Sequence, residues 1–161
     1  MSNYLLTRVP AGVQREQYMP LLLLADESEQ QVRSYLQSGD LYAFSHEDDL
    51  DAAGVILVLA QTTGVAELKA VAVKPLLQHR GIGMQMILAV LDDLRRRGIE
   101  RVVVGTANAA IGQLAFYQKA GFRLLRIERD FFSTRRGYPE FMQENDIRIL
   151  DMVWMDQLLA R

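Results

Sequence analysis

Six residues in the middle of the chain have the types and spacing of an anion-binding turn, Gln78-His79-Arg80-Gly81-Ile82-Gly83. They follow the apolar run Leu68 to Val73 and open a segment with helical spacing. A helix start presents unpaired backbone N–H groups and the positive end of the helix dipole, and both favour a phosphate. Gly81 and Gly83 lack a Cβ, so a polyphosphate could approach the backbone closely. The segment therefore predicts a phosphate site.

A Gly-x-Gly pair also occurs at helix starts that bind no phosphate. The glycines could merely let the chain turn after Pro75. A nucleotide P-loop needs a lysine and a hydroxyl residue after its last glycine, but Met84 and Gln85 stand there. A Rossmann fingerprint needs a third glycine, where Met86 stands, and an N-terminal βαβ unit. These two nucleotide motifs are therefore excluded.

The same turn and a second motif downstream together resemble a known family. Val71-Ala72-Val73 precedes the turn, and Gln78, Gly81 and Gly83 match the pattern Gln/Arg-x-x-Gly-x-Gly/Ala. Downstream stand Asn108 and the run Ala115-Phe116-Tyr117-Gln118-Lys119-Ala120-Gly121-Phe122. Together they resemble the acetyl-CoA pyrophosphate motif and the Asn…Leu-Tyr-x-Lys-x-Gly-Phe signature of the GNAT N-acetyltransferases. Asn108 and Tyr117 are nine residues apart, two more than in many members.

The resemblance implies how acetyl-CoA binds. Pantetheine would lie between the fourth and fifth strands and pair with the backbone of Val71, Ala72 and Val73. The pyrophosphate would rest on the backbone amides of residues 79–84, with side-chain contacts from Arg80 and Gln78. His79 would be a neighbour of the phosphate rather than a base. The cofactor-binding residues that the resemblance implies are Val71, Ala72, Val73, Gln78, His79, Arg80, Gly81, Ile82, Gly83, Met84, Asn108 and Tyr117.

The resemblance also implies two catalytic residues. Tyr117 would be the general acid that donates a proton to the departing thiolate, and the alternative is a half-buried packing residue on the helix. Glu67 stands at the start of the fourth strand, where several members carry the glutamate that takes the amine proton. Strand alternation would put Glu67, Lys69 and Val71 on one face. A solvated carboxylate at a strand end is the alternative for Glu67.

The elements that must position these residues follow from periodicity and turn signals. We expect an α+β (mixed α/β) chain with the GNAT fold: a central, mostly antiparallel sheet of six to seven strands, splayed between strands four and five and flanked by about four helices. Expected helices cover residues 13–26, 28–37, 81–97 and 111–120. Pro20 would delay or kink the first of them. Expected strands cover residues 4–9, 41–45, 53–61, 65–73, 101–105, 122–129 and 147–155.

Composition narrows the class of protein. The 161 residues carry a net charge of −2 and no cysteine. One domain over residues 1–161 is expected. The missing basic excess argues against nucleic acid, and no apolar run approaches the length of a membrane span. We expect a cytoplasmic protein, monomer or homodimer. The family resemblance implies acetyl-CoA as co-substrate and no metal.

The acceptor is not readable from the sequence. A long loop, residues 130–146, holds aromatic residues that could wall an acceptor pocket: Phe131, Phe132, Tyr138 and Phe141. Its acidic residues would attract a cationic amine, and nearby arginines would equally attract an acidic acceptor. We therefore expect an N-acetyltransferase acting on a small-molecule or peptide amine by direct attack in a ternary complex. The alternative is an acyl-CoA-binding sensor or interaction module with little catalysis.

Overall fold

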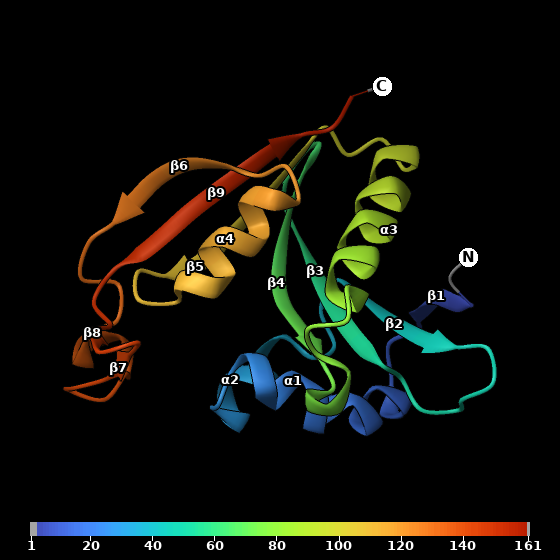
Figure 1. Ribbon diagram of the computed structural model, residues 1–161, viewed down its shortest axis with the longest axis horizontal. Coiled ribbons are helices and arrows are strands. Elements are labelled where there is room, and N and C mark those ends of the chain that lie inside the picture. Colours follow the sequence, from blue (N-terminus) through green and yellow to red (C-terminus); the bar gives the residue numbers. More distant parts are fainter. Residues whose placement is uncertain (1–2, 161) are drawn as a thin grey trace.

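A seven-stranded sheet forms the centre of the computed structural model, which describes residues 3–160 (Figure 1). The strand order is β1-β2-β3-β4-β5-β9-β6, and only the β4–β5 pair is parallel. The strands are β1 (Tyr4–Val9), β2 (Asp40–His46), β3 (Gly54–Thr62), β4 (Val65–Val73), β5 (Arg101–Ala107), β6 (Arg123–Glu128) and β9 (Met152–Leu158). This confirms the predicted mixed fold with a mostly antiparallel sheet.

Helices cover both faces of the sheet. One core packs the sheet against α3 (Ile82–Arg96) and α4 (Ile111–Lys119), and a second packs it against α1 (Met19–Ala25) and α2 (Glu29–Tyr35). The first predicted helix is correct only in part, because residues Val13–Tyr18 form a 3-10 helix, η1, and Pro20 lies in the first turn of α1. Two further 3-10 helices are η2 (Pro75–Leu77) and η3 (Thr134–Arg136).

The prediction of a single last strand over residues 147–155 is wrong. Strands β7 (Gln143–Glu144) and β8 (Ile147–Arg148) form a separate small hairpin, and β9 starts only at Met152. The hairpin turns at Asn145 and Asp146, whose φ angles of 54° and 59° are both left-handed. This conformation suits a two-residue hairpin turn and is favourable for Asn and Asp.

The parallel β4–β5 pair is short. Its register runs from Val65 opposite Arg101 to Leu68 opposite Val104 and ends there. Beyond that point β4 continues to pair with β3, and β5 continues to pair with β9. The two strands therefore diverge, and we call residues 69–73 and 105–107 the splay. The splay predicted between strands four and five is confirmed.

A β-bulge at Lys69 changes the faces of β4. Leu68 pairs with Val58 and Ala70 pairs with Leu57, so Lys69 is an extra residue on its strand. As a result Ala66 and Leu68 pack toward α3, whereas Ala70 and Ala72 pack toward α1. The prediction that Glu67, Lys69 and Val71 share one face is wrong for this reason. Glu67, opposite Leu59, lies on the α1–α2 face, as does Lys69 beside Tyr35 of α2, but Val71 faces α3.

A buried arginine holds α1 and α2 in position against the sheet. Arg15 is 3% exposed, and no acidic side chain within residues 3–160 pairs with it. Its guanidinium instead donates to four backbone carbonyl oxygens, including those of Val9 at 2.9 Å, Leu36 at 2.9 Å and Gly39 at 3.2 Å. These carbonyls belong to the end of β1 and to the segment between α2 and β2. One side chain therefore fixes three chain segments.

Replacing this arginine should destabilise the fold more than replacing an exposed one. Arg15→Met leaves several buried carbonyls without donors, and we expect it to lower the free energy of unfolding by about 3 kcal/mol. Arg33→Met is the control, since its ion pairs with Glu16 and Glu29 are half exposed and should contribute less than about 1 kcal/mol. Urea unfolding measures both. Equal losses would contradict this role of Arg15.

Candidate active site

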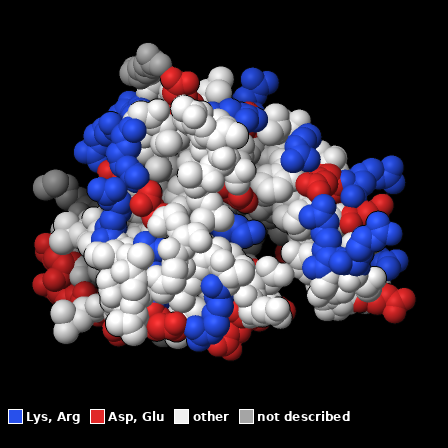
Figure 2. All heavy atoms as spheres, turned by 180° about the vertical axis from the view of Figure 1, so that it is seen from behind, with Lys and Arg blue, Asp and Glu red and all other residues white. Residues whose placement is uncertain are grey.

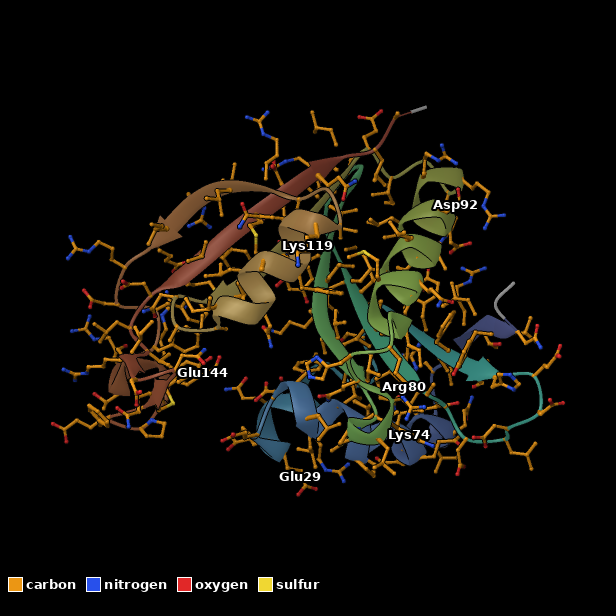
Figure 3. All side chains as sticks on the ribbon, viewed as in Figure 1. Glu29, Lys74, Arg80, Asp92, Lys119 and Glu144 are labelled. Atoms are coloured by element: carbon orange, nitrogen blue, oxygen red, sulfur yellow. The ribbon has the colours of Figure 1, made fainter. Side chains whose placement is uncertain are left out.

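The splay opens into a large cleft of about 880 Å³. Four parts of the chain line it: the end of β4, the turn before α3, one side of α4, and the β7–β8 hairpin. Figure 3 shows Arg80 and Lys74 on the segment that joins β4 to α3, and Glu144 on the hairpin at the other side. The lining residues are Val71, Ala72, Val73, Gln78, His79, Gly81, Gly83, Met84, Gly112, Gln113, Phe116, Tyr117, Glu144 and Asn145.

A small pocket of about 190 Å³ adjoins this cleft. It is lined by the end of α1 at Leu24 and Ala25, by β4 from Leu68 to Val73, and by Gly105 of β5. It shares Val71 to Val73, Gln78, Gln113 and Tyr117 with the large cleft. Because α1 lies on the opposite face of the sheet from α3, the two openings meet through the splay. Figure 2, seen from behind, shows a hollow between the main body and the lobe that carries β6 and β9.

The turn before α3 presents backbone donors to the large cleft. Gly81 is the N-cap of α3 with φ 79°, and no side chain caps this helix end. His79 also has a left-handed φ, 65°, so two of the three residues before the helix have a left-handed backbone. The first amides of α3 have no partner within the helix, and no acidic residue stands in its first turn. An anion in the cleft would therefore meet free N–H groups and the positive end of a 15-residue helix.

The predicted phosphate residues do not all reach the cleft with their side chains. His79, Gly81, Gly83 and Met84 line it. Ile82 is 4% exposed and packs in the core, so only its backbone faces the turn. Arg80 is exposed and is not among the lining residues.

Gln78 has a different contact from the predicted one. Its Nε2 donates to the carbonyl oxygen of Val73 at 3.0 Å, which closes the end of β4 onto the turn. The side chain still lines both openings through the splay. Its observed contact therefore shapes the turn, whereas the sequence resemblance predicted a phosphate contact.

Tyr117 stands where the two openings meet. It is 7% exposed, its ring makes edge contacts with Phe116 and Phe122, and it lines both the large cleft and the small pocket. Its hydroxyl makes no hydrogen bond to another residue in the described part of the chain. Burial raises the pKa of Tyr117, so the hydroxyl keeps its proton at neutral pH. The side chain is therefore a proton donor held at the splay.

Glu67 lies on the other face of the sheet, beside the small pocket. It pairs across the parallel ladder with Val103, one position before the strands diverge. Gln61 donates from Nε2 to its carboxylate at 2.5 Å. Burial raises the pKa of Glu67, and the charge of Lys69 and the bond from Gln61 partly oppose this shift. Its neighbours Leu68 and Lys69 line the small pocket, although Glu67 does not.

Asn108 has its hydrogen-bonding groups engaged by the segment before β9. Its Oδ1 accepts from the amides of Leu150 at 2.9 Å and Asp151 at 3.0 Å, and its Nδ2 donates to the carbonyl of Arg148 at 3.0 Å. It is not among the residues that line the large cleft. The observed contacts of Asn108 thus position the segment from the end of β8 to β9, and its role at the cofactor stays a prediction.

Five lining residues were not among the predicted site residues: Gly112, Gln113, Phe116, Glu144 and Asn145. Gln113 precedes Tyr117 by four residues, so helical spacing alone would have placed it on the same side of α4. Its Oε1 accepts from the hydroxyl of buried Thr106 at 2.9 Å, which leaves its Nε2 as a donor beside the splay. The two hairpin residues reach the cleft only through tertiary structure, since Asn145 donates to the carbonyl of Ala109 at 2.9 Å.

Residues 3–160 contain neither a cluster of metal-binding side chains nor a helix of membrane-spanning length. No group of three or more His, Cys, Asp or Glu side chains there could hold a metal ion. No helix in that range is long and apolar enough to cross a membrane.

Comparisons with known proteins agree with this geometry. The model of the Acetyltransferase (GNAT) family matches residues 13–122. The uncharacterized N-acetyltransferase YvbK of Bacillus subtilis is 41% identical over 133 residues, 83% of each chain.

Two solved structures share the fold over almost the whole chain. A Bacillus subtilis acetyltransferase in complex with CoA has a TM-score of 0.87 and 34% identity, and the match covers 98% of this chain and 99% of that one. A GNAT family acetyltransferase from Elizabethkingia anophelis with acetyl-CoA bound has a TM-score of 0.87 and 33% identity, covering 99% and 100%. Both neighbours hold the class of ligand that the sequence predicts for the large cleft. The chain therefore belongs to the acetyltransferase (GNAT) family.

Proposed function

We propose that this protein is an acetyl-CoA-dependent N-acetyltransferase that moves an acetyl group to a primary amine by direct attack in a ternary complex. The observation that carries the proposal is the passage through the splay. A large cleft on one face and a small pocket on the other meet at Tyr117. Two substrates could therefore enter from opposite faces and meet beside a buried proton donor.

The large cleft fits acetyl-CoA in size and in chemistry. The uncapped start of α3 provides amide donors and a positive dipole end for the pyrophosphate. Residues 69–73 of β4 pair with β3 on one side only, so their remaining backbone groups can pair with the amides of pantetheine. The bound CoA and acetyl-CoA of the two structural neighbours support this assignment.

The small pocket would hold the acceptor. Acetyl-CoA supplies an activated acyl carbon, and the amine nitrogen forms a bond to it while the carbon–sulfur bond breaks. The amine loses one proton, which Glu67 accepts through a water. The leaving sulfur gains one proton, which Tyr117 donates. No residue carries the acetyl group, and the chain has no cysteine that could do so.

The test is thiol release from acetyl-CoA with a library of amines, with acetylated products identified by mass spectrometry. We expect at least one amine to raise thiol release well above the rate without acceptor. Tight acetyl-CoA binding with no amine above background would instead support an acyl-CoA sensor, the alternative function.

Tyr117→Phe should separate chemistry from binding. It removes the proton donor but keeps the ring that packs between Phe116 and Phe122. We expect turnover to fall about 100-fold or more, the range of acid–base effects, while the Kd of acetyl-CoA stays within about twofold. Tyr18→Phe, at a tyrosine that lines neither opening, is the matched control. Unchanged turnover in Tyr117→Phe would remove this residue from the mechanism.

Glu67→Gln should change the pH profile of turnover. A base is active when deprotonated, so activity rises with pH through its pKa. Because the pKa of Glu67 is raised, this limb should lie at higher pH than for an exposed glutamate. In Glu67→Gln we expect a lower rate and loss of that limb, whereas Glu47→Gln, on an exposed turn, should keep the wild-type profile. A persistent acidic limb in Glu67→Gln would assign the base elsewhere.

A further inference from the structure

Lys69 is a cation without a fixed counterion at the mouth of the small pocket. It lines this pocket, and its Nζ lies 5.5 Å from the centroid of the Tyr35 ring. No carboxylate within residues 3–160 comes within ion-pair distance of it. Its charge still reaches Glu67, whose pKa it lowers against the effect of burial. Lys69 shares the face of Glu67 by strand alternation, and the β-bulge moves only the residues that follow it to the other face.

The acidic groups around this mouth have other partners. Asp26 accepts from the amide of Ser28 at 3.1 Å and from the hydroxyl of Tyr35 at 3.4 Å, so its carboxylate stabilises the α1–α2 turn. Glu67 accepts from Gln61. Neither carboxylate neutralises Lys69 by direct contact.

The lining of the small pocket is mainly polar, with one apolar and one aromatic side chain near Lys69. Leu24 lines the pocket from α1, and Tyr35 lies under the lysine. Phe131, Phe132 and Tyr138 of the loop before β7 form a ring cluster. Burial and the carboxylate of Asp26 raise the pKa of Tyr138 in this cluster. Lys69 itself is exposed, so its charge is accessible to an incoming anion.

We propose that Lys69 binds a carboxylate of the acceptor, so that the substrate is an aminocarboxylate such as a free α-amino acid. This inference rests on the proposed function. Glu67 and Lys69 share a face at two-residue spacing, roughly 6.6 Å along a strand. The acceptor carboxylate would pair with Lys69 while its amine points to the splay, with a water between the amine and Glu67. A polyamine would meet the uncompensated lysine and be disfavoured.

The test uses acceptors that differ only at the carboxylate: phenylalanine, phenylalaninamide and phenethylamine, with leucine, leucinamide and isoamylamine as a second trio. We measure kcat/KM for acetyl transfer in wild type, Lys69→Gln and Lys69→Arg, with Lys119→Gln on the exposed end of α4 as control. Wild type should prefer the acid of a trio over its amide at least tenfold. At a pH above the acidic limb of the profile, where Glu67 is deprotonated with or without Lys69, Lys69→Gln should lower kcat/KM for the acid by 10- to 100-fold and for the amide and amine less than twofold. Lys69→Arg should retain most of the preference.

Two results would overturn the inference. One is a wild-type enzyme that acetylates the amides, the amines or polyamines as well as it does the acids. The other is an equal loss for all three members of a trio in Lys69→Gln.

A binding readout separates this inference from the proposed function. Titration of each trio into the protein saturated with CoA, followed by NMR, reports acceptor binding without turnover. Binding that depends on the carboxylate and on Lys69, together with no acetyl transfer, would support this site and refute the transferase. Binding that does not depend on the carboxylate would refute the site, whatever the rate of turnover.

Discussion

The early end of the β4–β5 ladder is the constraint on which the rest of the structure depends. Backbone N–H and C=O groups inside a sheet need partners, and two parallel strands normally supply them to each other along their length. Here the pairing stops at Leu68 and Val104, while β3 and β9 hold the outer edges of the same strands. The inner edges of the splay are thus left for a ligand with amide groups of its own. The same gap connects the two faces of the sheet, so cofactor and acceptor need not share an entrance.

Because of the bulge at Lys69, the side chains before it and those after it point to opposite faces of the sheet. Before it, Glu67 faces α1 and α2, and after it, Val71 and Val73 face α3 and the large cleft. A regular strand would have put Glu67 and Val71 on the same face. Burial then acts on the proposed acid and base in compatible ways. Burial raises the pKa of Tyr117, and no charged group opposes this shift. Burial also raises the pKa of Glu67, but there the charge of Lys69 opposes the shift. The first group keeps its proton, and the second becomes a stronger base than an exposed glutamate.

The sequence predicted those parts of the site that local chemistry dictates. Gly81 is needed at a left-handed helix start, and Tyr117 belongs to a contiguous signature, so both were found. Helical spacing could have added Gln113. The bulge depends on how β3 and β4 pair, and neither strand alone specifies it. Likewise Glu144 and Asn145 reach the cleft only because Asn108 and Ala109 hold a hairpin about 40 residues away in the chain. Such long-range pairing is what a single sequence does not display.

This division also explains why the family is easier to recognise than the acceptor. Most groups that would contact acetyl-CoA are backbone amides at the start of α3 and along β4, and they require glycines and a strand rather than particular side chains. Those requirements leave a short, recognisable pattern. The small pocket is instead bounded by the end of α1, by β4 around the bulge, and by residues of β5 and α4, and side chains such as Leu24 and Lys69 can change without altering the backbone pattern that would hold acetyl-CoA. With the proposed acceptor site, acceptor choice would therefore depend on the charge at position 69 rather than on the fold.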